Sequence, residues 1–217
     1  MTDVGSEPTA DATVEPLPLV LASSSRYRRE LLERLGIPFA VDSPDIDETP
    51  NPGESARELV TRLSLAKARV VARRWPRALI IGSDQAATFA ERILGKPGTV
   101  QAAVRQLLAF SGRRVDFLTG VVVLNSATDR FRSAVDITTA RFRTVSASEV
   151  LRYVEEDKPL DCAGGIRFEG LGPLLLNGVD TADPTAAIGL PLIALGALLR
   201  AEGVNPLGPA TRVLSSG

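Results

Sequence analysis

The sequence predicts an α/β fold, in which strands and helices alternate along the chain. Apolar runs at residues 17–22 and 78–82 have the length and composition of buried strands. The leucines within residues 31–35 repeat at helical spacing. Ser55 and Ser146 each precede a glutamate by three residues, a capping-box pattern that marks the start of a helix. With 217 residues, the chain is long enough for one such domain or for two closely packed lobes.

The expected elements follow one another from an N-terminal strand to a C-terminal helix. The first half is expected to contain a strand at 17–22, a helix at 26–35 that Gly36 ends, a strand at 37–41, an acidic loop at 42–53, a helix from 55 to about 74, and a strand at 78–82 that ends at 83–85. The second half is expected to contain a hairpin around 91–92, a helix at 100–110, long strands at 115–125 and 131–142, a helix from 146 to about 156, and an apolar helix at 190–201. Residues 159–185 are rich in glycine and proline and receive no assignment.

The amino-acid composition limits the expected cellular location and the expected binding partners of the protein. A net charge of -1 gives no reason to expect binding to nucleic acid or to an anionic membrane, and no apolar stretch is long enough to span a bilayer. The single cysteine, Cys162, excludes an intramolecular disulfide and fits the reducing cytoplasm. Residues 1–16 are acidic and lack the pattern of a signal peptide. We therefore expect a cytoplasmic domain at 17–207, with a flexible N-terminal tail at 1–16 and a C-terminal tail at 208–217.

The chain has no histidine, which restricts the chemistry of any active site. Acid–base steps would fall to carboxylates, lysines or tyrosines. A metal would be held by oxygen atoms, which favours magnesium or manganese over zinc.

The junction between the first strand and the first helix is the first candidate site. Serines Ser23 to Ser25 come at the start of that helix, where hydroxyls and free amides bind anions. Arg26, Arg28 and Arg29 follow in the first turn, where positive charge opposes the helix dipole, and a bound phosphate would account for them. The spacing leaves a second interpretation open, in which Ser25 only caps the helix and the arginines are solvated.

Other polar residues add to this candidate site. Asp84 follows a buried strand, where α/β folds place ligand chemistry, although it also fits a structural cap. Glu48 lies in an acidic loop together with Asp45 and Asp47, and such loops are usually only solvated. Lys67 and Lys96 fit surface positions equally well, but with Arg28 they would neutralise a triphosphate.

Several short motifs, taken together, resemble those of the Maf family. They are LVLASSSRYRRELL at 19–32, PDIDETP at 44–50, IGSDQ at 81–85, LGKP at 94–97, TG at 119–120, DCAGG at 161–165, EG at 169–170 and IGLPL at 188–192. Each motif is short, but their order matches the family and covers about residues 17–207.

The resemblance implies an elongated mixed sheet flanked by helices, with two lobes around a deep cleft, as in the ITPase-like house-cleaning pyrophosphatases. It implies that water attacks the α-phosphate of a nucleoside triphosphate and that pyrophosphate leaves. Asp84 matches the proposed proton acceptor, Glu48 and Asp84 match positions for Mg²⁺ or Mn²⁺, and Arg28, Lys67 and Lys96 match the phosphate site. The family also allows a homodimer and is associated with inhibition of septum formation.

Three positions indicate the subfamily. These are Tyr27, Gln85 and Glu169. The aromatic residue at Tyr27 and the glutamate at Glu169 resemble the 7-methyl-GTP group, and the alternative is a dTTP/UTP pyrophosphatase. Methylated guanine is cationic and suits stacking on an aromatic ring, and a carboxylate accepts from its N1 and N2 donors. The chain departs from the family at Arg26, where proline is usual, and at residues 165–168, which are less polar than usual. Cys162 is interpreted as a packed residue, since no histidine is present to activate it.

Overall fold

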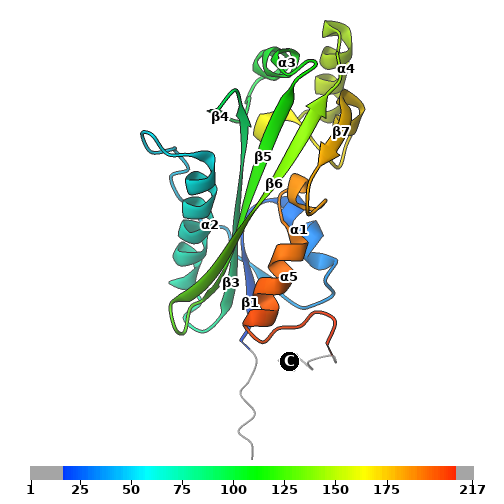
Figure 1. Ribbon diagram of the computed structural model, residues 1–217. Helices are drawn as coiled ribbons and strands as arrows, with labels where there is room; N and C mark the ends of the chain where they lie inside the picture. Colours follow the sequence, from blue (N-terminus) through cyan, green and yellow to red (C-terminus); the bar gives the residue numbers. More distant parts are fainter. Residues whose placement is uncertain (1–16, 209–217) are drawn as a thin grey trace, which may run out of the picture.

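The computed structural model describes residues 17–208, so the tail expected at 1–16 and all but the first residue of the tail expected at 208–217 lie outside it. A seven-stranded mixed sheet runs through the described part of the chain, with helices on both sides (Figure 1). The strands lie in the order β2-β1-β3-β5-β6-β7, and β4 pairs with β3. Their bounds are β1 Leu19–Ala22, β2 Ala40–Val41, β3 Leu79–Phe89, β4 Arg92–Leu94, β5 Arg114–Asn125, β6 Arg130–Phe142 and β7 Leu176–Asp180. The expected mixed α/β architecture is confirmed.

Three long antiparallel strands, β3, β5 and β6, connect the two ends of the molecule (Figure 1). β3 is parallel to β1 only from Leu79 to Gly82, whereas its ladder with β5 continues to Thr88. The prediction that this strand ends at 83–85 is therefore wrong. The polar side chains at 83–85 do not interrupt β3, because the backbone of these residues stays paired with β5. Asp84 accordingly lies in the middle of β3, just beyond the point where β1 ends.

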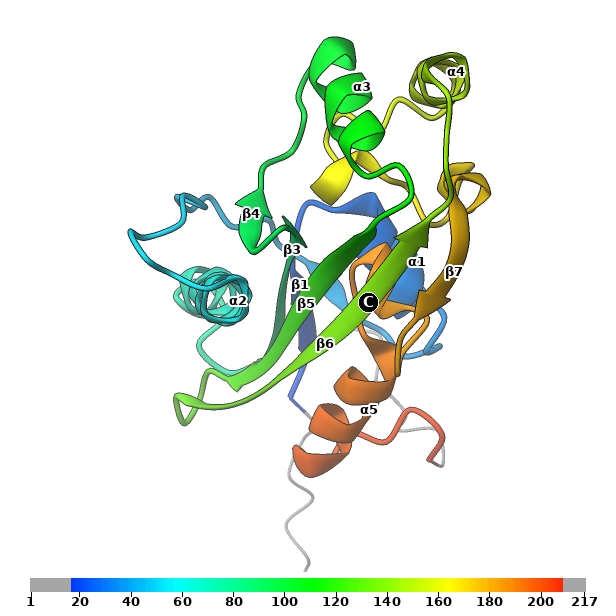
Figure 2. The same ribbon diagram turned by 45° about the horizontal axis from the view of Figure 1, so that its top comes forward.

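Helices cover both faces of the sheet, and their bounds are α1 Arg26–Glu33, α2 Ala56–Ala72, α3 Val100–Ala109, α4 Ala147–Asp157 and α5 Leu192–Ala201. α2 lies on one face, and α1 and α5 lie on the other, while α3 and α4 lie at the far end of the long strands (Figures 1 and 2). Leu21, Leu31 and Leu199 belong to a core beneath α1 and α5. Phe117 and Tyr153 belong to a separate core beneath α3 and α4. The described chain therefore has two lobes that share the long strands.

Most local predictions are confirmed. Ser55 and Ser146 both form the expected capping boxes. The strand expected at 37–41 is only β2, because the apolar side chains before Ala40 pack into the core beneath α1 instead of extending the sheet. The unassigned segment 159–185 contains β7 and two short 3-10 helices, and a third follows it: η1 Ala163–Gly165, η2 Gly172–Leu175 and η3 Ala186–Ile188. No helix within residues 17–208 is long and apolar enough to cross a membrane.

Two glycines of the sheet let α2 approach it closely. A Cβ atom at Gly82 would clash with the backbone carbonyl of Ser64, and one at Gly120 would lie 2.7 Å from the carbonyl oxygen of Val60. Both carbonyls belong to α2, so the helix backbone rests directly on the strands. This close packing holds Lys67, one turn further along α2, beside β3.

We predict that Gly82→Ala lowers the free energy of unfolding by about 1–3 kcal/mol, because α2 has to move away from the sheet to admit the methyl group. Chemical denaturation followed by circular dichroism measures this change. Gly95→Ala is the matched control, since a Cβ there meets nothing within 4 Å, and its effect should stay within about 0.5 kcal/mol. Equal stability of the two variants would contradict the close packing of α2.

Candidate active site

The two lobes enclose a cavity of about 850 Å³. Its walls come from the β1–α1 junction, from α2 and the loop before it, from β3, and from the loops around β4 and η1. Ten of the candidate residues named from the sequence line this cavity: Ser23, Ser25, Tyr27, Arg28, Glu48, Lys67, Asp84, Gln85, Lys96 and Glu169. The fold therefore brings these ten residues together.

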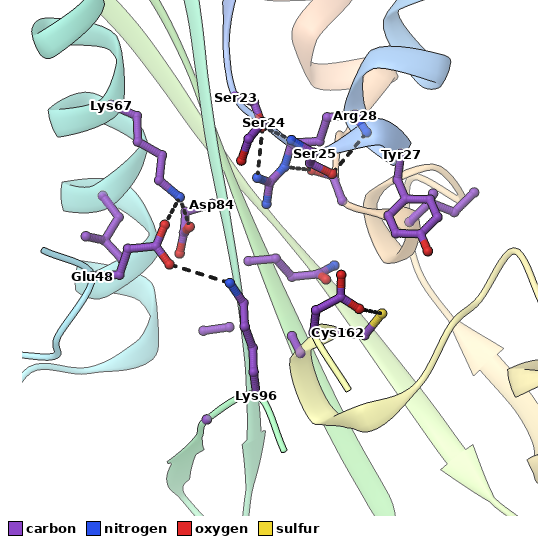
Figure 3. A pocket seen from close by; sticks show the side chains of 18 of the residues that line it. Ser23, Ser24, Ser25, Tyr27, Arg28, Glu48, Lys67, Asp84, Lys96 and Cys162 are labelled. Atoms are coloured by element: carbon purple, nitrogen blue, oxygen red, sulfur yellow. Dashed lines mark hydrogen bonds and ion pairs between the residues drawn. The ribbon is translucent and has the colours of Figure 1, made fainter. Parts of the chain in front are cut away.

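Lys67 joins two carboxylates at the centre of this cavity (Figure 3). Its Nζ lies 2.5 Å from Oδ1 of Asp84 and 2.6 Å from Oε1 of Glu48. Lys67 and Asp84 are only 6% and 7% exposed, so neither the surface position considered for the lysine nor a simple turn cap for the aspartate describes them. Because buried charges are costly without partners, this contact holds both side chains in place.

Glu48 forms the exposed end of the same cluster. Its Oε2 lies 3.7 Å from Nζ of Lys96, whose side chain is exposed. Partial burial acts to raise the pKa of Glu48, but the hydrogen bond from Lys67 and the charges of Lys67, Lys96 and Arg28 outweigh it and leave the pKa below its ordinary value. Glu48 is therefore an anion at neutral pH and is available to a cation.

Ion pairs near both of its ends hold the loop that carries Glu48 beside α2. Arg62 donates two hydrogen bonds to Glu54, at 2.6 and 2.8 Å, and Arg74 binds Asp42 near the other end of the loop. Bidentate pairs of this kind restrict orientation as well as position. The other acidic residues considered in this loop are exposed and lie outside the cavity: Asp45 and Asp47.

The serine segment forms another wall of the cavity (Figure 3). Ser25 caps α1, since its Oγ accepts from the amide of Arg28 at 3.4 Å. Ser23 Oγ accepts from the amide of Ser25 at 3.1 Å and from Nη1 of Arg28 at 3.4 Å. Arg28 also donates from Nε to the carbonyl oxygen of Gly189 at 2.9 Å. Burial lowers the pKa of the Arg28 guanidinium from its usual value, and the carboxylates of the central cluster act in the opposite direction.

The three arginines of the first turn have different surroundings. Arg28 is hydrogen-bonded to the carbonyl oxygen of Gly189 in the cavity wall. Arg26 instead pairs with Glu30 at 3.3 Å, and Arg29 pairs with Glu33 at 2.9 Å. Arg29 does not line the cavity, so for this residue the structure favours the second interpretation, a solvated side chain. Ion pairs four residues along the helix neutralise the exposed arginines locally.

The residues expected to recognise the base lie near one another. Figure 3 shows Tyr27 on the far side of Arg28 from Lys67 and Asp84. The guanidinium of Arg167 lies 5.5 Å from the centre of the Tyr27 ring, and its Nε donates to Oε1 of Glu169 at 3.1 Å. The side-chain amide of Gln85 donates at 3.0 to 3.1 Å to three acceptors: Oγ1 of Thr119 and the carbonyl oxygens of Ala186 and Ala187.

Cys162 also lines the cavity and is partly buried. Burial, with a smaller contribution from the charges of Asp161 and Glu169, raises the pKa of its thiol to about 12. The group is therefore a neutral thiol at physiological pH. This agrees with the interpretation of Cys162 as a packed residue and not as a nucleophile.

Two features in or beside the cavity were missed by reasoning from the sequence. Arg167 was noted only as part of an unusual segment, yet it contacts two of the predicted base-binding residues. The carbonyl oxygen of Gly189 accepts from Arg28 and from Ser83, although the motif that contains it had no assigned role. The signal for Gly189 is its position in that motif, whereas nothing in the sequence places Arg167 over an aromatic ring.

The cluster meets some of the requirements of a magnesium site but does not complete one. Within residues 17–208, no group of three or more carboxylate, histidine or cysteine side chains could hold a metal. Glu48 and Asp84 supply two carboxylates, and Mg²⁺ commonly uses one or two of these and completes its shell with water and substrate phosphates. The residues therefore fit a metal that arrives with a polyphosphate.

Comparison with known proteins identifies the family to which the chain belongs. The chain is 52% identical to a protein of Pseudomonas aeruginosa named 7-methyl-GTP pyrophosphatase, over 86% of this chain and 97% of that one. It is 51% identical to a protein of the same name from Aromatoleum aromaticum, over 86% of this chain and 96% of that one. Among solved structures, the Ham1 protein of Staphylococcus aureus has 16% identity and a TM-score of 0.43, over 58% of this chain and 71% of that one. Residues 18–202 match the family model described as Maf-like protein, so the chain belongs to the Maf family.

Proposed function

We propose that this protein hydrolyses 7-methyl-GTP to 7-methyl-GMP and pyrophosphate. The observation that carries the proposal is one cavity that holds both a charged cluster, Glu48, Lys67 and Asp84, and an aromatic–carboxylate pair, Tyr27 and Glu169. A volume of about 850 Å³ lies within the range of small-molecule sites. The relatives that are 51% and 52% identical carry the name of this activity.

Three positive side chains support binding of the triphosphate. Arg28, Lys67 and Lys96 reach the cavity from α1, from α2 and from the loop after β4. Phosphoryl transfer depends mainly on positioning and on charge stabilisation, which such residues supply. Lys67 is already oriented by two carboxylates, so little rearrangement is needed when the phosphates bind.

Asp84 is proposed to accept the proton of the attacking water. Its Oδ1 is bonded to Lys67, and no partner within residues 17–208 occupies Oδ2. Water attacks the α-phosphorus, its proton passes to Asp84, and the bond from the α-phosphorus to the bridging oxygen breaks to release pyrophosphate. Lys67 and Arg28 are placed to stabilise the negative charge that moves onto the leaving group.

We also propose that Mg²⁺ or Mn²⁺ takes part, with Glu48 and Asp84 as its protein ligands. For Asp84 this role is the alternative to proton acceptance, because both roles use Oδ2. When bound, such an ion supplies charge neutralisation on the phosphate oxygens. Lys67 lies between the two carboxylates, so the oxygens that remain for a cation are Oδ2 of Asp84 and Oε2 of Glu48.

The proposed base site consists of Tyr27 and Glu169. The ring of Tyr27 already attracts guanidinium groups, and a methylated guanine is a flat cation of the same sign. Stacking of a cation on an aromatic face contributes about 0.5–2 kcal/mol. Glu169 is an acceptor for the N1 and N2 donors of guanine, and pyrimidines offer no such pair.

We further propose a cytoplasmic location, and the homodimer stays a prediction.

A panel of nucleotides tests the function. The protein is incubated with Mg²⁺ or Mn²⁺ and, separately, 7-methyl-GTP, GTP, dTTP, UTP or CTP, and the monophosphate and pyrophosphate are measured. We expect the highest kcat/KM for 7-methyl-GTP and loss of turnover with EDTA, because the metal is proposed to neutralise charge on the phosphate oxygens. Preference for dTTP or UTP would contradict the substrate, and no turnover of any nucleotide would favour a role as a regulator of cell division.

We predict that Asp84→Asn lowers kcat at least 100-fold while 7-methyl-GTP still binds, because the amide does not accept the proton of water. Kinetic assays measure the rate, and calorimetry measures binding to the inactive variant. Asp47→Asn is the matched control, because Asp47 is exposed and lies outside the cavity. A near-normal rate for Asp84→Asn would remove this residue from the mechanism.

We predict that Glu169→Gln lowers the ratio of kcat/KM for 7-methyl-GTP to that for UTP by about tenfold or more. Replacement of the carboxylate removes a charged acceptor, and hydrogen bonds to charged groups contribute about 1.5–3 kcal/mol. Turnover of UTP is the internal control, since a pyrimidine has no matching donors. An unchanged ratio would show that Glu169 does not recognise the base.

A further inference from the structure

Asp183 is a buried charged side chain that the proposed function does not use. It is 2% exposed and does not line the cavity, whereas Ala187 and Gly189, a few residues further along the chain, do. A buried carboxylate is costly unless hydrogen bonds replace its contacts with water, so its partners show what it supports. We propose that Asp183 is a positioning residue for Arg28, and that it acts through the backbone carbonyl of Gly189.

The carboxylate of Asp183 holds both ends of the segment 185–193. Its Oδ1 accepts from the amide of Thr185 at 2.9 Å and from the hydroxyl of the same residue at 2.6 Å. Its Oδ2 accepts from the amide of Ile193 at 2.6 Å, in the first turn of α5. The residue before α5 is Pro191, whose side chain makes no capping bond, so Asp183 supplies an acceptor that the start of this helix lacks.

The hydroxyl of Thr185 joins the same two ends. It donates to Asp183, and its oxygen accepts from the amide of Leu192 at 2.9 Å. The residues between these ends therefore form a closed loop, which contains η3 and Gly189. Because side chains hold both ends of this loop, the positions of its backbone carbonyls depend on Asp183 and Thr185.

The closed loop presents a carbonyl group to the phosphate side of the cavity. The oxygen of Gly189 accepts from Nε of Arg28 at 2.9 Å and from Oγ of Ser83 at 3.1 Å. Within residues 17–208, the other hydrogen bond of the guanidinium goes to Oγ of Ser23 at 3.4 Å, so Gly189 is its closer partner. The φ angle of Gly189 is 125°, which residues with a side chain rarely adopt, so this backbone conformation requires glycine.

The contact with Gly189 fixes the orientation of the Arg28 guanidinium. A guanidinium binds phosphate best when its planar set of N–H donors faces the phosphate oxygens. With Nε bonded to Gly189, N–H groups of both Nη atoms remain for an anion. If the loop is released, Arg28 keeps its charge and loses this orientation. The inference rests on the proposed function only in taking Arg28 as a residue of the phosphate site.

The first test is Asp183→Asn, which keeps the size of the side chain. An amide has one acceptor oxygen, so it does not accept at both Thr185 and Ile193, and one end of the loop is released. The probe is inorganic tripolyphosphate with Mg²⁺, and its dissociation constant is measured by calorimetry on the full chain. We expect this constant to rise by about threefold to tenfold, as for the loss of one ordinary hydrogen bond. An unchanged constant would overturn the proposal, and so would absence of binding to the original protein.

Asp157→Asn is the matched control, because Asp157 is also a buried aspartate that accepts from a backbone amide, that of Leu171 at 2.7 Å. It is the last residue of α4 and does not line the cavity. We expect the dissociation constant of tripolyphosphate to stay within about twofold of that of the original protein. A rise as large as that for Asp183→Asn would overturn the proposal, since any disturbed loop would then have the same effect.

A double-mutant cycle tests whether Asp183 acts through Arg28. In Arg28→Met the guanidinium is absent, while Lys67 and Lys96 remain in the cavity to bind tripolyphosphate. We expect Asp183→Asn to change the dissociation constant by less than about twofold in this background, because residues that act as a unit have non-additive effects. The full threefold to tenfold rise in the Arg28→Met protein, which is about the effect of one hydrogen bond, would overturn the proposal.

Thr185→Val tests the same loop without changing Asp183, and it decides the question if Asp183→Asn does not fold. It removes the hydroxyl that joins Asp183 to Leu192 and keeps the shape of the side chain. We expect the dissociation constant of tripolyphosphate to rise by about twofold to fivefold, and Thr185→Ser, which keeps the hydroxyl, to bind as the original protein does. A rise in both variants or in neither would overturn the proposal.

Hydrolysis of nucleotides is a separate result, because binding of tripolyphosphate does not require turnover of a nucleotide. If the protein hydrolyses no nucleotide but Asp183→Asn weakens tripolyphosphate binding through Arg28, the positioning role stands and the pyrophosphatase does not. If hydrolysis occurs and Asp183→Asn leaves tripolyphosphate binding unchanged, only the role of Asp183 is lost.

Discussion

The ion pairs of Lys67 are the interaction on which the candidate site depends. One ammonium group, nearly buried, lies within 2.6 Å of the carboxylates of Asp84 and Glu48, and these come from a strand and from a loop. Burial makes each charge costly on its own, so the three side chains are stable only as a set. The set also joins α2, β3 and the acidic loop, so this one contact fixes the relative positions of three segments of the chain.

That contact requires α2 to lie close to the sheet. Gly82 and Gly120 leave room for the carbonyl groups of the helix, and the two residues face α2 from adjacent strands. With larger side chains at these positions, the ammonium of Lys67 would be held further from Asp84. Backbone packing and the electrostatics of the cavity are therefore linked, although the glycines make no contact with the charged groups themselves.

The other side of the cavity is organised by the loop after η1. Arg167 shares its N–H groups between Glu169 and the end of α4, and buried Asp157 binds the same loop. On the phosphate side, Arg28, Lys67 and Lys96 outnumber Glu48 and Asp84. The cavity thus has an excess of positive charge where phosphates are expected.

The sequence by itself determined the α/β class, both capping boxes, most element positions and the residues that line the cavity. These follow from local periodicity, from capping chemistry and from motifs whose order identifies a family. Tertiary structure alone decided that β3 continues through Asp84 and that the guanidinium of Arg167 lies over the ring of Tyr27. The reason is physical: each of these outcomes depends on which partner is nearest in space. Neither the pairing of a strand with β5 nor the approach of a guanidinium to a ring far along the chain leaves a periodic mark in the sequence.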